Sequence, residues 1–174
     1  IFFFLIIMNC PFNYKDCKKK NQKMFANLGT LPRVDVLLSK KDLKKKILLK
    51  PLKAYFCKKC FLVQHPVYTN PKDIFIDEYI YYSSTVKSWV DHCKVFVKKS
   101  IKRFFLTKSS FIVEVASNDG YLLQHFVKRK IPCLGVEPSS GVINEAKKKG
   151  VETINDFYNY ISVKKIVKNY SKAD

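Results

Sequence analysis

The feature that most constrains the fold is an alternation of strand and helix patterns that begins after Phe105. Residues 111–116, FIVEVA, form a short β-branched run of the kind found in buried parallel strands. The polar turn SNDG follows, and YLLQHFVKRK then places apolar residues at helical spacing. IPCLGVE predicts a second strand, and GVINEAKKKG predicts a second helix that ends at Gly150. This β-α-β-α order predicts an α/β fold with a parallel sheet.

The remainder of the chain divides into three segments by composition. Residues 8–66 contain cysteines, prolines and short apolar runs, which predict a small loop-rich unit with strands. Residues 67–104 carry the aromatic stretch IFIDEYIYYSSTVKSW and a predicted helix over residues 88–104. Residues 1–7, IFFFLII, are shorter than the roughly 20 apolar residues of a bilayer span, and we interpret them as a non-native or read-through leader. The α/β region then occupies residues 105–174.

The charge of the chain gives only a weak indication of its partners. The formal net charge is +19, and most of the excess is lysine in short runs, with three arginines in the whole sequence. Nucleic-acid readers usually combine arginine with aromatic residues on one face, so we regard nucleic acid as an unlikely partner. An AT-rich coding sequence produces the same lysine bias without any binding role. A basic surface would nevertheless attract anionic substrates such as nucleotide diphosphates.

The cysteines predict a small metal site. Residues 57–60, CKKC, have the spacing of a knuckle in which Cys57 and Cys60 share one tetrahedral Zn(II). Cys10 and Cys17 would supply the other half, although six residues separate them. The alternatives are a redox pair, which we disfavour because the strand-like KAYF precedes Cys57, and simple burial.

The other two cysteines are predicted to be core residues. Cys93 lies on the apolar face of the predicted helix, and Cys133 lies in the second predicted strand. The chain shows no secretory signal, so we expect a cytoplasmic protein without disulfides and without a membrane partner.

The turn after the first predicted strand and the acid after the second indicate a nucleotide-like ligand. Glu137 follows the second strand, at the position where nucleotide-binding folds place an acid that binds ribose hydroxyls. The turn has Glu114, Ala116, Asn118 and Gly120 in place of the full G-x-G-x-x-G of NAD enzymes. S-adenosylmethionine has no pyrophosphate, so one glycine and polar side chains suit it better, and its ammonium group requires a nearby carboxylate or carbonyl. A strand, loop and helix without any ligand is the alternative.

Four motifs together resemble one family. VEVASNDGYLLQHF, LGVEPSSGV, YFCKKCFLVQ and DEYIYYSSTVKSWVDH are similar to the sugar C-methyltransferases, which use S-adenosylmethionine and carry an N-terminal zinc-binding domain. The resemblance covers nearly all of residues 8–174 in the same order. It implies a zinc module followed by the first part of a Rossmann-like domain, and a nucleotide-linked keto-deoxysugar as substrate. A zinc-ribbon module that binds nucleic acid is the alternative function, but it leaves Glu114, Glu137 and the SNDG turn unexplained.

The resemblance also implies roles for individual residues. The cofactor site would comprise Glu114, Ala116, Ser117, Asn118, Asp119, Gly120 and Glu137. The sugar pocket would include Tyr79, Tyr81, Ser83 and Ser84, of which the alternating residues face one side if the segment is extended. An aromatic packing layer is the alternative for that segment. The zinc ligands would be Cys57, Cys60 and Cys17, with Cys10 as the weakest match.

The resemblance places the general base in a segment beyond Asp174. Methylation of a carbon beside a ketone requires removal of an α-proton and stabilisation of the resulting enolate. By position, none of the three histidines, His65, His92 and His125, takes that role. We therefore expect an N-terminal fragment without turnover of its own, with an apolar sheet edge that lowers its solubility.

Overall fold

The structure is a computed structural model that describes residues 21–34, 37–66, 69–75 and 79–174. The chain divides into two compact units, residues 1–71 and 72–174, and each is described separately. Among the described residues, no helix combines the length and apolar character that a membrane crossing would require. The described residues form a mixed α/β structure with one small sheet in each unit.

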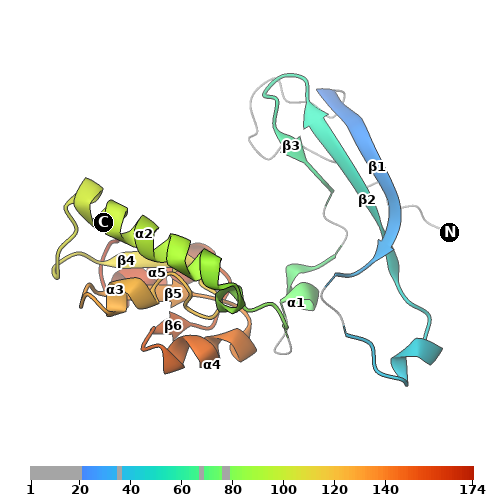
Figure 1. Ribbon diagram of the computed structural model, residues 1–174. Coiled ribbons are helices and arrows are strands. Elements are labelled where there is room, and N and C mark those ends of the chain that lie inside the picture. The colour runs from blue at the N-terminus through green and yellow to red at the C-terminus, as the bar shows by residue number, and fades with distance from the viewer. Residues whose placement is uncertain (1–20, 35–36, 67–68, 76–78) are drawn as a thin grey trace. The chain divides into compact units, whose positions relative to one another are not determined.

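Unit 1 contains an antiparallel sheet of three strands in the order β1-β2-β3. The strands are β1 (Gln22–Pro32), β2 (Leu49–Cys57) and β3 (Val63–Gln64), and a 3-10 helix, η2 (Asp42–Lys44), lies in the connection between β1 and β2. β1 pairs with β2 from Gln22 opposite Cys57 to Pro32 opposite Leu49, with two irregularities of register. The strands predicted for this segment are confirmed (Figure 1). β2 ends at the first cysteine of the CKKC motif.

Unit 2 contains a parallel sheet of three strands in the order β4-β5-β6. The strands are β4 (Ile112–Val115), β5 (Cys133–Val136) and β6 (Thr153–Ile154). The helices of this unit are α2 (Lys87–Phe104), α3 (Gln124–Val127), α4 (Ser140–Lys148) and α5 (Tyr160–Asn169). A 3-10 helix, η3 (Ser83–Thr85), precedes α2, and the short helix α1 (Pro71–Ile74) spans the boundary between the units. The predicted parallel α/β region and the predicted helix before it are both confirmed.

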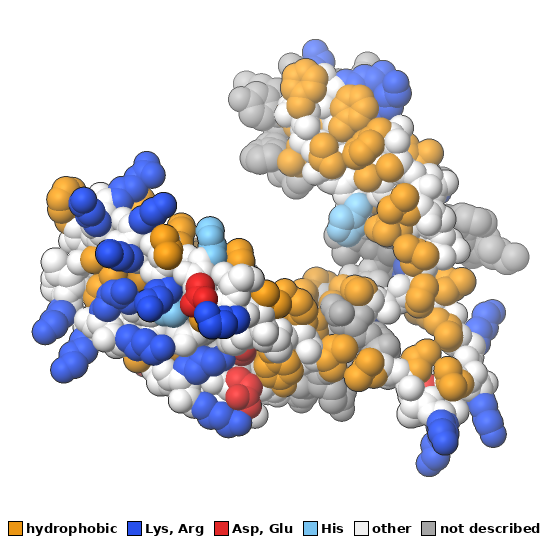
Figure 2. All heavy atoms as spheres, viewed as in Figure 1, with side chains coloured by type: hydrophobic (Ala, Val, Ile, Leu, Met, Phe, Trp, Pro, Cys, Tyr) orange, Lys and Arg blue, Asp and Glu red, His pale blue; other side chains and the backbone are white. Residues whose placement is uncertain are grey.

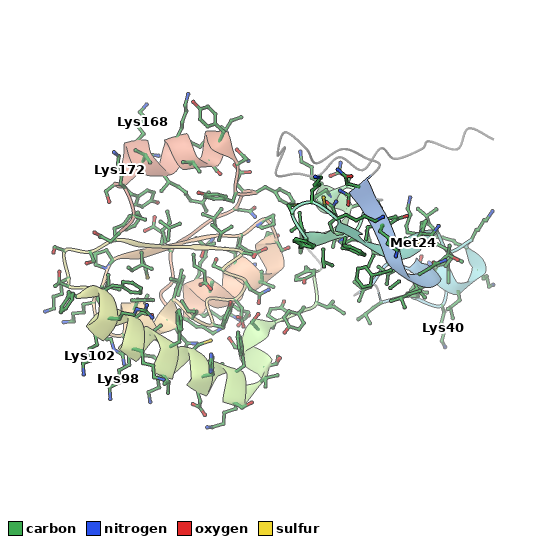
Figure 3. The ribbon with its side chains drawn as sticks, turned by 90° about the horizontal axis from the view of Figure 1, so that it is seen from above. Met24, Lys40, Lys98, Lys102, Lys168 and Lys172 are labelled. Atoms are coloured by element: carbon green, nitrogen blue, oxygen red, sulfur yellow. The ribbon has the colours of Figure 1, made fainter. Side chains whose placement is uncertain are left out.

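Helices cover both faces of the parallel sheet. On one face, Val97 of α2, Phe126 of α3 and Ala146 of α4 belong to one buried cluster. On the other face, Ile166 of α5 packs with Leu134 of β5 in a second cluster. Figure 3 shows the same layers, with Lys98 and Lys102 projecting from α2 on one side and Lys168 projecting from α5 on the other. The central strand β5 is therefore mostly buried, which explains its apolar sequence.

The helix after β4 is shorter than the sequence predicts. α3 covers only Gln124–Val127, because several amides near it bond three residues back rather than four. Phe126 N donates to Leu123 O over 2.9 Å, and Lys130 N donates to Val127 O over 2.9 Å. The 3-10 turns on either side of α3 take the place of further α-helical turns in the connection between β4 and β5.

β4 forms one edge of its sheet within the described residues. Val115 of β4 keeps 49% of its surface exposed, as an apolar strand edge would. At the start of the strand, Asp174 Oδ2 accepts a hydrogen bond from Phe111 N over 2.8 Å, and Asp174 N donates to Phe111 O over 3.0 Å. Val115 is thus an exposed apolar residue on the edge strand, while the low solubility stays a prediction.

The surface of unit 2 is strongly basic on one face. Figure 2 shows lysine and arginine side chains over α2 and the elements next to it, with few acidic side chains among them. Lys87 and Asp91 pair over 2.6 Å on this helix, but both side chains are largely exposed. Such a pair adds little stability, so the face is mainly a solvated cationic surface.

Candidate functional site

The SNDG turn leaves β4 through three residues with left-handed backbone. Ala116, Asn118 and Gly120 have φ angles of 58°, 49° and 74°. Glycine is required at the third of these, because a Cβ on Gly120 would lie 3.0 Å from Val151 Cγ2 and 3.2 Å from Ala146 Cβ. The turn is therefore a tight, strained connection of the kind that concentrates at ligand sites.

Backbone amides of the turn are already bonded within the protein. Ala116 N donates to Val136 O over 2.8 Å, which ties the turn to the end of β5. Gly120 N donates to Ser117 O over 3.0 Å. A phosphate cradle needs such amides to point at the ligand, so these two amides do not form one.

Glu137 holds the turn against the end of β5. Its carboxylate is buried, with Oε2 accepting from Asn118 N over 3.0 Å and Oε1 accepting from Ser139 N over 3.0 Å. Asn155 Nδ2 also donates to the carbonyl oxygen of Glu137 over 3.2 Å. Each carboxylate oxygen has a second lone pair, so Glu137 retains acceptor capacity for the hydroxyl groups of a ligand.

Glu114 lies on β4 with a buried carboxyl oxygen. Its Oε2 atom has no hydrogen-bond partner in the structure. Burial is the main cause that raises the pKa of Glu114 to about 8; the nearby carboxylates of Asp119 and Glu137 contribute to this shift, and a hydrogen bond with Tyr121 opposes it. The group is therefore mainly protonated at neutral pH, unless a cationic ligand favours its ionised form.

The site as a whole is rich in buried oxygen atoms that lack partners. Within the described part of the chain, these include Glu114 Oε2, Ser117 Oγ, Asp119 Oδ1 and Ser139 Oγ. Unsatisfied buried oxygens cost free energy unless a ligand or water bonds them. A ligand with donor groups, such as an ammonium group and ribose hydroxyls, fits this set better than an anionic phosphate does. The residues at the site therefore fit the predicted cofactor.

The predicted substrate segment lies directly against this turn. Asn118 Oδ1 accepts a hydrogen bond from Ser83 N over 2.9 Å, and Asn118 Nδ2 donates to Tyr81 O over 3.0 Å. Asp119 Oδ2 accepts from Ser84 N over 3.2 Å. The structure thus brings together two groups of residues that the sequence placed about 35 positions apart.

The segment is only partly extended. Ser83 belongs to η3, so the regular alternation of side chains does not continue beyond Tyr82. The ring of Tyr79 packs on Phe75 with a centroid distance of 5.5 Å, whereas Tyr81 keeps 55% of its surface exposed. Tyr79 thus contributes to aromatic packing, and Tyr81 presents a side chain to solvent.

Lys149 joins the two groups, although no feature of the sequence marks it as a site residue. Its Nζ atom lies 2.7 Å from Ser84 Oγ, 2.6 Å from Asp119 O and 3.0 Å from Asp119 Oδ2. It is the third residue of the run Lys147–Lys149, and a charge run is normally solvated. Only its place just after α4, opposite the turn, distinguishes it from its neighbours.

The two cysteines of the CKKC motif form a turn between β2 and β3. Phe61 N donates to Cys57 O over 2.8 Å, and Cys57 N donates to Leu62 O over 3.0 Å, so the backbone folds back within the motif. Cys57 is fully buried and Cys60 is partly buried. Two thiols on one tight turn fit half of a tetrahedral zinc site.

The predicted partners of these cysteines, Cys10 and Cys17, lie outside the described residues. Within the described ranges, no group of three or more potential metal ligands gathers. Cys93 is buried in the core of unit 2, as predicted, and burial raises the pKa of the half-buried Cys133 to about 11. These two thiols are therefore inert core groups rather than ligands.

The three histidines take structural or surface positions. His125 is buried with Nε2 3.2 Å from Val90 O, and burial lowers its pKa. His92 stacks on Trp89 with a centroid distance of 5.3 Å, and His65 Nδ1 lies 3.0 Å from Pro66 O. That none of them acts as the general base stays a prediction.

Comparison with known proteins found two sequence similarities. Residues 15–75 match a family model described as "Putative zinc binding domain". The chain is also 30% identical over 129 residues to the C-methyltransferase NovU of Streptomyces niveus. That match covers 74% of this chain and 30% of the length of NovU. The chain therefore resembles the C-methyltransferase NovU over part of that protein's length, in agreement with the family that its motifs indicated.

Proposed function

We propose that this chain is part of an S-adenosylmethionine-dependent C-methyltransferase that acts on a nucleotide-linked keto-deoxysugar. The observation that carries the proposal is the set of buried, unpartnered oxygens around the SNDG turn, next to the acid after β5. The match to NovU supports the reaction class. In this proposal unit 2 contributes the first part of a Rossmann-like cofactor domain.

The cofactor would lie along the turn between β4 and α3. Glu137 would accept hydrogen bonds from the ribose hydroxyls, since its carboxylate is fixed by Asn118 N and Ser139 N. Glu114 and Asp119 would face the positively charged methionine part, and a cation there would stabilise the ionised form of Glu114. When bound, the cofactor supplies an electrophilic methyl group to a carbon nucleophile.

The sugar would lie beside residues 79–84. Tyr81 offers an exposed hydroxyl group, and the backbone of the segment is fixed against the turn by Asn118. The cationic surface of unit 2 would attract the diphosphate of the nucleotide carrier. The reaction also needs a base that removes the α-proton, and the expectation that this base lies beyond Asp174 stays a prediction.

Zinc would have a structural role in unit 1. Cys57 and Cys60 would hold the metal from the turn between β2 and β3, together with Cys17 and Cys10. Unit 1 leaves large side chains such as Phe25 and Leu28 exposed on β1, so its apolar burial is small. A metal would supply folding free energy that this burial does not.

Calorimetric titration of the chain with S-adenosylmethionine tests the proposal. We expect saturable binding that Glu137→Gln abolishes, because this change removes an acceptor from the predicted ribose site. Glu145→Gln is the matched control, since Glu145 is a partly exposed acid on α4 that pairs with Lys148. Absence of binding to folded wild-type protein, or tighter binding of NAD, would refute the cofactor assignment.

A further inference from the structure

The ammonium group of Lys149 occupies a position that uses its full donor capacity. A lysine ammonium group has three N–H donors, and three acceptors surround this one: Ser84 Oγ, Asp119 O and Asp119 Oδ2. The Lys149 side chain is 25% exposed and that of Asp119 is 3% exposed, so this pair is much less hydrated than the other ion pairs of unit 2. The contact is therefore a specific one rather than a solvated surface charge.

The acceptors of Lys149 belong to two different elements. Asp119 is part of the SNDG turn, and Ser84 is part of η3 in the 79–85 segment. Asp119 Oδ2 also accepts from Ser84 N, so the carboxylate, the ammonium group and the serine form a closed cycle of hydrogen bonds. Without Lys149, the buried carboxylate of Asp119 would keep Ser84 N as its one hydrogen-bond donor within the described residues.

We propose that Lys149 is a positioning residue that holds residues 81–85 against the SNDG turn. A ligand bound at the turn would then also stabilise the ordered conformation of residues 81–85. Asp119 is the shared element, because Oδ2 contacts Lys149 and Ser84 while Oδ1 is buried without a partner beside the turn. A ligand that donates to Oδ1 or restrains the turn lowers the entropic cost of ordering the segment. Cofactor and substrate sites are thereby coupled.

Hydrogen exchange of the Ser83 and Ser84 amides measures this fastening directly, since both amides donate to side chains of the turn. We expect Lys149→Met to raise their exchange rates by about tenfold or more, the factor that corresponds to about 1.4 kcal/mol of local opening. Amides of the sheet, such as Gly135 N and Glu137 N, are expected to keep their wild-type rates.

Lys148→Met is the matched control, because it removes the same charge from the adjacent position and breaks only an exposed pair with Glu145. Ser84→Ala is a second variant that removes one acceptor and keeps the carboxylate paired. It should raise exchange within residues 81–85 by about threefold, as expected for one lost hydrogen bond. The proposal would be overturned if the amides of residues 83 and 84 exchanged at wild-type rates in both Lys149→Met and Ser84→Ala. A uniform increase of exchange that includes the sheet amides would also overturn it.

A second arm adds S-adenosylhomocysteine, and it rests on the proposed function. Wild-type exchange at Ser83 and Ser84 should slow on binding, and this protection should disappear in Lys149→Met that still binds the compound. Protection retained in Lys149→Met would overturn the coupling. Absence of binding to the wild type would refute the proposed function, whereas the exchange data without ligand would still decide whether Lys149 fastens the segment.

Discussion

Glu114→Gln is expected to remove a large pH dependence from the stability of unit 2. Burial, with the carboxylates of Asp119 and Glu137, raises the pKa of Glu114 from 4.5 to about 8 in the folded protein. Between these values the folded state holds a proton that the unfolded state has released. The stabilisation is therefore fully present below pH 4.5 and is lost as the pH rises through 8.

The size of the effect follows from the two pKa values. Between about pH 5.5 and about pH 7.5, the free energy of unfolding of the wild type should fall by about 2.5 kcal/mol relative to the variant. Glutamine has the shape of the protonated acid and does not titrate, so the two proteins should be similar in stability below pH 4.5, where the acid is protonated in both states. At the higher pH the variant should be the more stable protein. His125, whose pKa is lowered by burial, acts in the opposite direction, but it is present in both proteins and cancels.

Urea unfolding followed by tryptophan fluorescence measures this difference. Trp89 is the single tryptophan of the sequence and lies in α2, so it reports on unit 2. Glu145→Gln serves as control, because Glu145 is a partly exposed acid on the same unit. Parallel pH profiles for wild type and Glu114→Gln would show that Glu114 is ionised and solvated in the folded state, which would refute the burial argument.

Three further changes test other parts of the structure. Gly120→Ala should destabilise unit 2 by about 1–2 kcal/mol in urea unfolding, because φ is 74° and the new Cβ would lie 3.0 Å from Val151 Cγ2; an unchanged midpoint would contradict this. Asn159→Ala should lower the free energy of unfolding by about 1 kcal/mol in the same assay, because Asn159 Oδ1 caps α5 by accepting from Ile161 N and Ser162 N. An unchanged free energy of unfolding would mean that the cap is not formed in solution. Cys57→Ser should lower the zinc content of the purified protein, measured by atomic emission, while the control Cys133→Ser should leave it unchanged. Equal zinc content in the two variants would show that Cys57 is not a zinc ligand.

The secondary structure of unit 2 was predictable because its signals are local. The β-branched run of β4 and the helical spacing in α2 each reflect burial against one sheet, and burial imposes a period on the sequence. The shortened α3 was not predictable, since apolar spacing alone does not distinguish an α-helix from successive 3-10 turns. The register irregularities of β1 against β2 depend on pairing between distant residues, which leaves no local pattern.

The site was predictable in its composition but not in its connections. The turn and Glu137 were recognisable because strand ends restrict which residues meet a ligand. The contact between Asn118 and Ser83 joins residues 35 positions apart, and nothing in either segment predicts its partner. Lys149 was hidden for the same reason, because three successive lysines look alike until the fold places one of them beside a buried carboxylate.

The side chains of the turn explain why it contains asparagine and aspartate where phosphate-binding loops have glycine. Asn118 tolerates a φ of 49° better than most residues do, and its amide offers one acceptor and one donor. The acceptor bonds Ser83 N and the donor bonds Tyr81 O, a combination that neither a carboxylate nor glycine provides.

The next position has the opposite requirement. Asp119 must accept from Ser84 N and from the ammonium group of Lys149, so an anionic group without donors is the appropriate one. Glycines in both places would allow the same backbone path and would leave Tyr81 O, Ser83 N and Ser84 N without these partners. In the proposed function the turn would have two roles: its buried oxygens would bind the cofactor, and Asn118 and Asp119 would hold the segment that lines the sugar pocket.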